Sequence, residues 1–560
     1  MDINGILERA GRSWRGPVLA ALVALVAGLP GLIALPPLDR DESRFAQASA
    51  QMLETGDFVS PRFQDTPRFK KPVGIYWLQA AAVASLSHVE DRQIWAYRIP
   101  SILGAMLAAA ACAWGAAAML GPGASLLAGA MLGASFLLSA EASIAATDGV
   151  LAGGVTLAMA ALGRLYLSAR GGPAAGRKTK VLFWVGMAVS ILVKGPIGPM
   201  IAALTMVALC IWDRKARWLK DLGWGWGLIG IVALVGPWAL AITVASDGAF
   251  WGASLGGDLA PKLLGGQEGH GEPPGFYLAL APLLLFPATA LAPAGALVGW
   301  RARAEPGVRF ALCWLVPAWV VFEITPTKLV HYPLPLYGAL TWLMARALIE
   351  APGRIVRWIG AALTFLVALA FAAVGPLASA KIDAGVGVAW ALVAAALFFG
   401  AGAAGAWFMI RSQMVGALLA GGALGLAAHG LLLGAVAPSL RPLWLSDRAA
   451  KALAAAGASP RQGVISGPVT VAGYEEPSLV FLLGTGTELG DAAAAADAIA
   501  EGRPAIVEAR QTAAFQAALT AAGVKARRAG EGAGLDYSNG QHDVLQIFLP
   551  ASPPAPQNGP

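Results

Sequence analysis

Long runs of apolar residues recur along this chain from near its N-terminus to about residue 437. Most are about 20 residues long, the length that a helix needs to cross a hydrocarbon core of about 30 Å. The runs fall near residues 17–36, 73–88, 98–120, 122–140, 146–168, 181–194, 196–212, 224–245, 276–299, 308–323, 331–349, 356–376, 387–410 and 414–437. The pattern predicts a polytopic α-helical membrane protein with a membrane domain over residues 1–437.

The charges between these runs predict the orientation of the chain. Basic residues gather in short loops at 169–180, 213–221, 301–309 and 346–357, and the positive-inside rule places these loops and the N-terminus in the cytoplasm. Counting back from them puts both ends of 73–88 on the outer face, so we expect an interfacial or re-entrant helix there. About 13 spans remain, with the C-terminus outside. The first run is too long for a removable signal peptide and is expected to be an anchor.

The composition changes at about residue 438. Short β-like runs at 463–465, 469–472, 479–483, 505–508 and 544–549 alternate with Ala-rich helical runs at 491–500 and 512–522. Residues 438–549 are therefore expected to form a small α/β domain on the outer side. The Pro-rich tail at 550–560 is expected to be disordered.

Composition narrows the function classes. The chain is 57% hydrophobic and 13% charged, whereas a soluble domain carries roughly 25% charged residues. The net charge of +7 comes from loops that set orientation, so it does not indicate nucleic-acid binding. The three cysteines, Cys112, Cys210 and Cys313, lie inside apolar runs and indicate neither a disulfide framework nor a metal cluster.

Unusual polar residues concentrate in the loops that the charge count places outside, above all in 37–97. The acidic pair Asp41-Glu42 directly follows the first span. The full set comprises Asp41, Glu42, Arg44, Lys70, Lys71, Asp148, Lys194, Glu268, His270, Lys328 and His331. An active site on the outer face, at the membrane boundary, explains this asymmetry most simply.

Several short motifs occur in a fixed order through the membrane part. They are Asp41-Glu42-Ser43-Arg44, Pro67–Trp77 with Lys71-Pro72, Arg98-Ile99-Pro100-Ser101, Ala146-Thr147-Asp148, Lys194-Gly195-Pro196, His270 with Pro274 and Tyr277, and Lys328–Pro335. This ordered set resembles the bacterial polyprenyl-phosphate-sugar glycosyltransferases, which include the aminoarabinose transferase of lipid A and are akin to the protein O-mannosyltransferases. The resemblance implies the multispanning GT-C fold in the bacterial inner membrane.

The resemblance also implies the chemistry. Asp41 would be the general base that deprotonates the acceptor hydroxyl, with Glu42 orienting its helix or the acceptor. Inversion without a covalent sugar intermediate needs only this one base. The acceptor would be lipid A, another lipid, a glycan or a protein, and membrane lipids would surround what we expect to be a monomer. Cations would hold the leaving phosphate and polar groups the sugar or acceptor: Arg44, Lys71, Lys194 and Lys328 for the donor phosphate, and Asp148, His270 and Tyr332 for the sugar or acceptor.

One departure from the aminoarabinose branch bears on metals. That branch has an acid where this chain has Lys70 and a tyrosine where it has Arg68, and the acid contributes to a metal site there. No cofactor is assigned with certainty, and a divalent metal held by Glu268 and His270 is left as an alternative.

Each candidate also has a purely structural interpretation. Asp41 and Asp148 could be helix N-caps. Lys194 and Lys328 could snorkel from span ends, Lys70-Lys71 could bind anionic headgroups, and Glu268 with His270 could belong to a mobile polar loop. A different function is a transporter or flippase for a lipid-linked saccharide, although the chain lacks the internal repeat typical of transporters. A third is a non-catalytic assembly or sensor protein that presents the outer domain.

Overall fold

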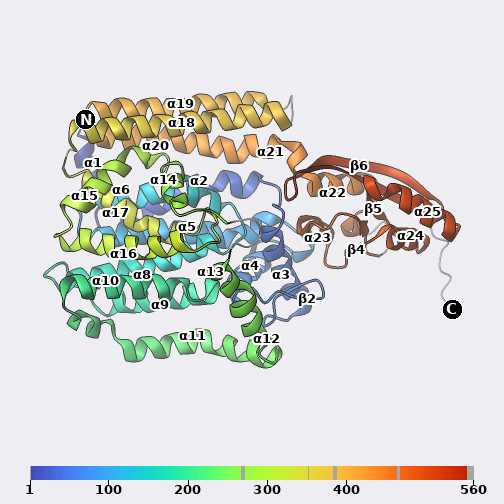
Figure 1. Ribbon diagram of the computed structural model, residues 1–560, viewed down its shortest axis with the longest axis horizontal. Coiled ribbons are helices and arrows are strands. Elements are labelled where there is room, and N and C mark those ends of the chain that lie inside the picture. Colours follow the sequence, from blue (N-terminus) through green and yellow to red (C-terminus); the bar gives the residue numbers. More distant parts are fainter. Residues whose placement is uncertain (1, 266–270, 351, 383–386, 463–466, 552–560) are drawn as a thin grey trace.

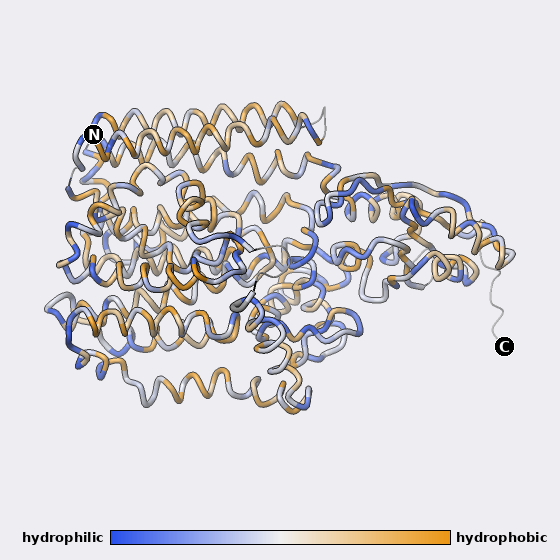
Figure 2. The backbone as a smooth tube through the Cα atoms, in the orientation of Figure 1, coloured by the Kyte–Doolittle hydropathy of each residue, from blue (hydrophilic) through white to orange (hydrophobic). Residues whose placement is uncertain are grey.

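The computed structural model of the protein describes all residues except 1, 266–270, 351, 383–386, 463–466 and 552–560. A long helical bundle and a smaller C-terminal domain lie end to end along the longest axis (Figure 1). The bundle helices are hydrophobic along most of their length, whereas polar residues gather at the two ends of the bundle and in the C-terminal domain (Figure 2).

Eight helices in the described residues are long and apolar enough to cross a membrane. They are α2 (Arg15–Ala34), α5 (Ile94–Ala116), α8 (Asp148–Ser168), α11 (Trp224–Ala245), α16 (Pro306–Ile324), α18 (Arg354–Ile382), α19 (Val388–Ile410) and α20 (Met414–Leu431), which continues through η6 (Leu432–Val436) and α21 (Ala437–Ser439). The pair α6 (Pro122–Ala134) and α7 (Phe136–Ala142), bent by 59°, makes a ninth if it is one span. The prediction of a polytopic helical membrane protein is confirmed.

The other predicted spans form shorter, broken or charged helices. They are α9 (Arg177–Lys194), α10 (Ile197–Asp213), α14 (Phe276–Leu284) followed by η4 (Ala288–Leu291) and α15 (Ala292–Arg301), and η5 (Leu334–Leu336) followed by α17 (Tyr337–Ala347). Proline explains the breaks, because it lacks the amide N–H that continues a helix. Pro287 separates α14 from η4, and Pro333 and Pro335 delay the start of α17. Eight or nine candidate spans are thus found, and the count of 13 stays a prediction.

Residues 37–97, which the charge pattern predicts to be the first outer loop and which keep that name here, lie between the bundle and the C-terminal domain (Figure 1). This loop contains α3 (Asp41–Thr55), the two-residue strands β1 (Arg62–Phe63) and β2 (Thr66–Pro67), α4 (Gly74–Leu86) and η1 (Val89–Asp91). The apolar helix α4 has 13 residues, or about 20 Å at 1.5 Å per residue, which is too short to cross a bilayer. This length agrees with the surface or re-entrant helix expected at 73–88.

Smaller helices connect or flank the spans. They are α1 (Ile3–Ala10), η2 (Arg217–Leu222), α12 (Ala249–Trp251), the π-helical η3 (Gly252–Leu259) and α13 (Ala260–Leu264). Helices α12 and α13 reach down beside the first outer loop at the same end of the bundle (Figure 1).

The C-terminal domain is built on a five-stranded mixed sheet of order β4-β3-β5-β7-β6. Strand β3 runs parallel to β4 and β5, while β7 is antiparallel to β5 and β6. The strands are β3 (Thr470–Ala472), β4 (Glu488–Gly490), β5 (Ala505–Glu508), β6 (Ala526–Asp536) and β7 (Gln541–Pro550). The helices are η7 (Arg441–Leu443), α22 (Leu445–Ala455), η8 (Pro460–Gln462), α23 (Pro477–Leu483), α24 (Ala492–Ala500), η9 (Ala509–Gln511) and α25 (Thr512–Ala522).

Sequence patterns predicted much of this domain. The strands at 469–472, 505–508 and 544–549 and both Ala-rich helices are confirmed. The strand predicted at 479–483 is wrong, because those residues belong to α23. Pro477 is its first residue, a position where the fixed φ of proline favours a helix start. Strands β4 and β6 were not predicted, and the strand predicted at 463–465 and most of the tail lie outside the described residues.

Close packing of α5 on α8 sets the geometry of the end of the bundle that carries residues 37–97. A Cβ atom on Gly104 would come within 2.4 Å of the carbonyl oxygen of Gly149, and one on Gly153 within 2.6 Å of the carbonyl oxygen of Gly104. Only glycine permits backbones to approach this closely. A Cβ atom on Gly149, the second residue of α8, would come within 2.7 Å of the carbonyl oxygen of Ser101, so the start of α8 lies against α5 about one turn after Arg98.

Candidate functional site

A cavity of about 330 Å³ opens at the end of the bundle that carries the first outer loop. Its walls come from six separate stretches of sequence, and the side chains are mostly charged. The charged and aromatic lining residues are Asp39, Arg40, Asp41, Glu42, Arg44, Phe45, Arg68, Lys70, Lys71, Glu141, Asp148, Lys194, Asp258, Lys262, His331 and Tyr332. Seven of the residues predicted to have a catalytic or binding role therefore line one cavity: Asp41, Glu42, Arg44, Lys71, Asp148, Lys194 and Tyr332.

Asp41 presents a carboxylate to this cavity. It is the first residue of α3, and its side chain is 70% exposed, so a molecule in the cavity can reach it. Arg68 lies 3.4 Å from its Oδ1 atom. The partial loss of water raises the pKa of Asp41, but the charges of Arg68 and Arg44 outweigh this effect and hold the pKa below its usual value. The carboxylate is therefore ionised at neutral pH and able to accept a proton.

Glu42, unlike its neighbour Asp41, has a buried carboxylate with several hydrogen-bond partners. Its carboxylate is buried and receives two hydrogen bonds of 2.8 Å from the guanidinium of Arg98. The amides of Leu38 and Ala145 donate to the same carboxylate at 2.8 and 2.7 Å. All four contacts hold the start of α3 against the bundle. This arrangement fits the supporting part of the prediction for Glu42, orientation of its helix.

Asp148 and Lys194 form an ion pair in the cavity wall. Lys194, the last residue of α9, places its Nζ atom 2.5 Å from Oδ1 of Asp148, the first residue of α8. The same ammonium lies 5.3 Å from the centre of the Tyr332 ring, a cation–π distance. The three residues predicted for phosphate and sugar contacts thus interact directly.

Lys71 shares a carboxylate with a second lysine. Asp258 in η3 receives Lys71 at 2.5 Å and Lys262 at 2.7 Å. Burial lowers the pKa of Lys71 to about 8, although the Asp258 charge opposes this change. Lys262 and Asp258 were not predicted as site residues, because neither lies in one of the ordered motifs.

His331 lies between two buried acids. Its Nδ1 atom is 3.4 Å from Oε1 of Glu141, and its Nε2 atom is 3.6 Å from Oδ2 of Asp148. Burial lowers the pKa of His331, so the imidazole is neutral at pH 7 even though the Asp148 charge acts in the opposite direction. Glu141 was missed by sequence reasoning, since it lies inside an apolar run and only its charge there could have indicated it.

Glu141, Asp148 and His331 also form a group that could hold a metal ion, because their ligand atoms lie within 4.8 Å of one another. Carboxylate and imidazole ligands suit Zn²⁺ or Mn²⁺. Two features weigh against a tight site. The Lys194 ammonium already occupies Asp148, and the two nitrogens of His331 face different acids. The alternative ligands, Glu268 and His270, lie outside the described residues.

Lys328 does not line the cavity. Its side chain is buried, and its ammonium donates to the backbone carbonyls of Glu272 at 2.6 Å and Thr325 at 2.8 Å. In this position it ties two loop segments together, while its neighbours Thr327 and Leu329 reach the cavity. The predicted phosphate contact of Lys328 therefore has no support from its placement.

A smaller cavity of about 110 Å³ adjoins the first. The two share Lys71, Asp148, Lys194, Asp258, Lys262 and Tyr332. Its remaining walls are mostly apolar side chains of α8, α10 and α16: Leu151, Ile197, Met200, Val321 and Phe322. The combined space runs from a charged chamber to an apolar one, so it suits an amphipathic ligand with a charged head and a hydrocarbon tail.

This chain is similar in sequence to known membrane glycosyltransferases. Residues 37–249 match the family model for dolichyl-phosphate-mannose-protein mannosyltransferases. An undecaprenyl phosphate-alpha-4-amino-4-deoxy-L-arabinose arabinosyl transferase of Pseudomonas paraeruginosa is 30% identical over 334 residues, which are 57% of this chain and 58% of that protein. A relative of the same description from Pectobacterium atrosepticum is 27% identical over 66% of each chain. The chain thus matches less than two thirds of the length of the first relative.

Solved structures show the shared fold. The crystal structure of ArnT from Cupriavidus metallidurans bound to undecaprenyl phosphate has a TM-score of 0.76 at 18% identity, covering 94% of this chain and 97% of that one. The apo oligosaccharyltransferase of Archaeoglobus fulgidus has a TM-score of 0.51 at 11% identity, covering 84% of this chain and 64% of that one. Together, the family match, the relatives and the fold confirm the resemblance that the motifs indicated.

Proposed function

We propose that this protein is an integral-membrane glycosyltransferase that moves a sugar from an undecaprenyl-type polyprenyl phosphate to an acceptor hydroxyl on the outer face of the membrane. One observation carries the proposal: an accessible carboxylate, Asp41, lies in the same cavity as the ammonium groups of Lys71, Lys194 and Lys262. The relatives bear names that specify an undecaprenyl-phosphate donor. The adjoining apolar cavity is suited to the first part of a prenyl chain.

The proposed reaction is a single displacement. The acceptor oxygen attacks the anomeric carbon, and its proton passes to the Asp41 carboxylate. The bond from that carbon to the phosphate oxygen breaks, and its electron pair stays on the phosphate. Lys71, Lys194 and Arg44 offset the developing negative charge. Attack opposite to the leaving phosphate inverts the configuration at the anomeric carbon, and no second carboxylate is needed as nucleophile.

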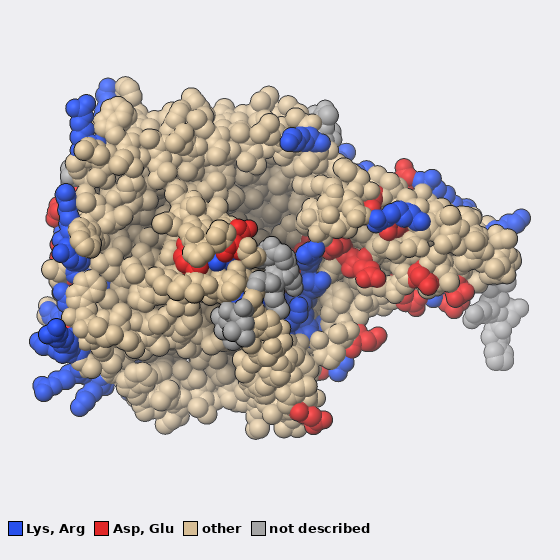
Figure 3. Space-filling model, in the orientation of Figure 1, with Lys and Arg blue, Asp and Glu red and all other residues tan. Residues whose placement is uncertain are grey.

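The orientation follows from the same proposal. Lys and Arg side chains gather at the end of the bundle opposite the C-terminal domain (Figure 3), as expected for a cytoplasmic surface. The cavity and the C-terminal domain would then be periplasmic, with 13 crossings if the shorter helices also span. The acceptor is lipid A, another lipid, a glycan or a protein, and the protein acts as a monomer in the bacterial inner membrane.

The test is sugar transfer by the purified full-length protein in proteoliposomes. The probe donor is undecaprenyl phosphate carrying 4-amino-4-deoxy-arabinose, the acceptor is lipid A, and mass spectrometry detects both products. Comparing envelope lipids and glycans of cells with and without the gene identifies the natural acceptor. Asp41→Asn should abolish transfer without loss of folded protein. Undiminished transfer by that variant contradicts the assignment of the base, and movement of the donor across the bilayer without product favours a flippase.

A further inference from the structure

The C-terminal domain packs directly on the helix that begins with Asp41. Phe481 and Leu482 of α23 join a buried cluster with Ala46 and Ala50 of α3. The ring of Tyr97 in α5 meets Phe481 edge-on, with centroids 5.2 Å apart. The contact is therefore a hydrophobic interface, so the domain packs on the bundle in addition to being connected to it through the last span.

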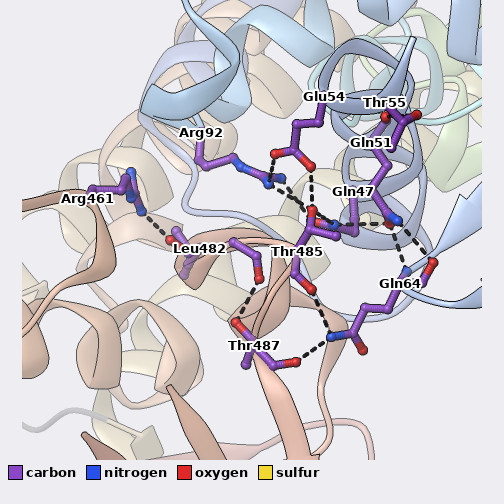
Figure 4. Close-up of polar contacts among 11 residues, drawn as sticks. Gln47, Gln51, Glu54, Thr55, Gln64, Arg92, Arg461, Leu482, Thr485 and Thr487 are labelled. Atoms are coloured by element: carbon purple, nitrogen blue, oxygen red, sulfur yellow. Dashed lines mark hydrogen bonds and ion pairs between the residues drawn. The ribbon is translucent and has the colours of Figure 1, made fainter. Parts of the chain in front are cut away.

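A polar network fixes the middle and the C-terminal end of α3 to the same domain (Figure 4). The hydroxyl of Thr485 accepts hydrogen bonds from Gln47 at 2.7 Å and Arg92 at 3.1 Å and donates to Glu54 at 2.6 Å. Gln64 donates to the carbonyl oxygen of Thr485 at 3.2 Å. Four residues of the first outer loop thus converge on one threonine.

The other end of α3 is held by different residues of the domain. The hydroxyl of Ser478 donates to the carboxylate of Asp39. The amide of Asp39 donates to the hydroxyl oxygen of Tyr537 at 2.7 Å, and the guanidinium of Arg40 donates to the carbonyl oxygen of Ser538 at 2.8 Å. These contacts reach the two residues that immediately precede Asp41.

These contacts matter because the backbone of Arg40 adopts an unusual conformation. Its φ angle is +60°, in a region that residues with a Cβ atom rarely adopt. Such a conformation persists only where surrounding contacts hold it. Arg40 is the residue before the first turn of α3, so its conformation sets the direction in which Asp41 enters the cavity.

We propose that the C-terminal domain positions Asp41, with Ser478 and Tyr537 acting as positioning residues through Asp39 and Arg40. None of the described residues after 437 lines the cavity, so the domain acts on the geometry of the site and not by contact with substrate. This inference rests on the proposed function, because it assumes that Asp41 takes part in the reaction.

The experiment uses the full-length protein with two variants that remove one hydroxyl each, Tyr537→Phe and Ser478→Ala. Amide hydrogen exchange of residues 39–55 reports how firmly α3 is held. Steady-state transfer, with the donor and acceptor named above, reports kcat and KM. Thr520→Ala is the matched control, since among the described residues this hydroxyl donates only to the Gln516 carbonyl, within α25. Ser478→Thr keeps a hydroxyl and should restore function.

We expect kcat to fall about tenfold in both variants, as a small displacement of a catalytic group has large effects on rate. KM for the donor should stay unchanged because the lysines are untouched, and exchange near residues 39–46 should quicken. Unchanged kcat overturns the positioning role, whether or not exchange quickens. Asp41→Asn separates the proposed general base from the proposed positioning. Full turnover by Asp41→Asn refutes Asp41 as the base. If Asp41→Asn is inactive while Tyr537→Phe and Ser478→Ala are fully active, only the positioning role is refuted.

Discussion

Arg98 holds Glu42 in a buried, two-pronged ion pair, with Nε 2.8 Å from Oε1 and Nη2 2.8 Å from Oε2. Arg98 also donates to the backbone carbonyls of Leu35 at 2.7 Å and Pro36 at 3.0 Å, just before α3. The acidic pair therefore divides into two tasks. Glu42 anchors the helix, and Asp41, one residue earlier, faces the cavity.

Glu42→Gln should destabilise the protein strongly. The change leaves the Arg98 charge buried without its counter-ion, which costs about 3–5 kcal/mol in comparable cases. Thermal unfolding in detergent measures the loss. Asp41→Asn is the matched control and should cost less than about 1 kcal/mol, because its exposed carboxylate makes a single 3.4 Å contact with Arg68. Equal destabilisation by the two variants would contradict the division of tasks.

Lys194→Met should weaken binding of undecaprenyl phosphate, whereas Lys328→Met should not. A hydrogen bond to a charged group is worth about 1.5–3 kcal/mol, so we expect at least a tenfold rise in Kd for Lys194→Met. The Lys328 ammonium is already bound by two carbonyl oxygens away from the cavity. Titration of the lipid into protein in nanodiscs measures both Kd values. A larger effect at Lys328 would restore its predicted phosphate contact.

Donor binding should depend on pH through Lys71. Burial lowers its pKa to about 8, so the free protein loses this positive charge as the pH rises through that value. The affinity for undecaprenyl phosphate should therefore fall above about pH 8, with the midpoint displaced upward because the bound phosphate favours the charged form. Kd measured between pH 7 and 9.5 tests this. Lys71→Arg should flatten the curve, and an unchanged curve in that variant assigns the titration elsewhere.

Docking of the C-terminal domain should weaken as the pH rises. Burial and the nearby charges of Glu476 and Asp536 raise the pKa of Asp39 to about 7, while Ser478 and Tyr537 act in the opposite direction. A raised pKa means that the docked state retains the proton, so docking is strongest below the ordinary pKa of an aspartate, 3.8, and is lost progressively up to about pH 7. Hydrogen exchange of α23, corrected for intrinsic rates, follows this change. Asp39→Asn should remove it.

Transfer should survive the removal of divalent ions. The Lys194 ammonium supplies positive charge at Asp148, and the nitrogens of His331 point to different carboxylates. Turnover before and after treatment with a chelator is the measurement. Loss of activity that Mn²⁺ restores would contradict this prediction. In that case, His331→Gln tests whether Glu141, Asp148 and His331 bind the ion, because the variant should then no longer recover activity with Mn²⁺.

Local sequence patterns predicted several helices and strands of the C-terminal domain correctly, but they did not predict which residues contact one another. Alternating and Ala-rich runs identified β3, β5, β7, α24 and α25, since each depends mainly on its own periodicity. The apolar run of α23 was assigned to a strand because a short buried helix and a buried strand look alike in sequence. The lengths of the broken spans were also overestimated, because hydropathy does not register how a proline interrupts backbone hydrogen bonds.

The sequence by itself determined the membrane class and named most residues that line the cavity, and it predicted that these residues lie on the outer face. Apolar runs and loop charges carry that information locally, and the ordered motifs carry the resemblance. Only the tertiary structure decided what each charge does. Glu42 meets Arg98 56 residues away and Asp39 meets Tyr537 498 residues away, and Lys328 turns to backbone carbonyls. Such pairings depend on how distant segments pack, and neither hydropathy nor spacing encodes that packing directly.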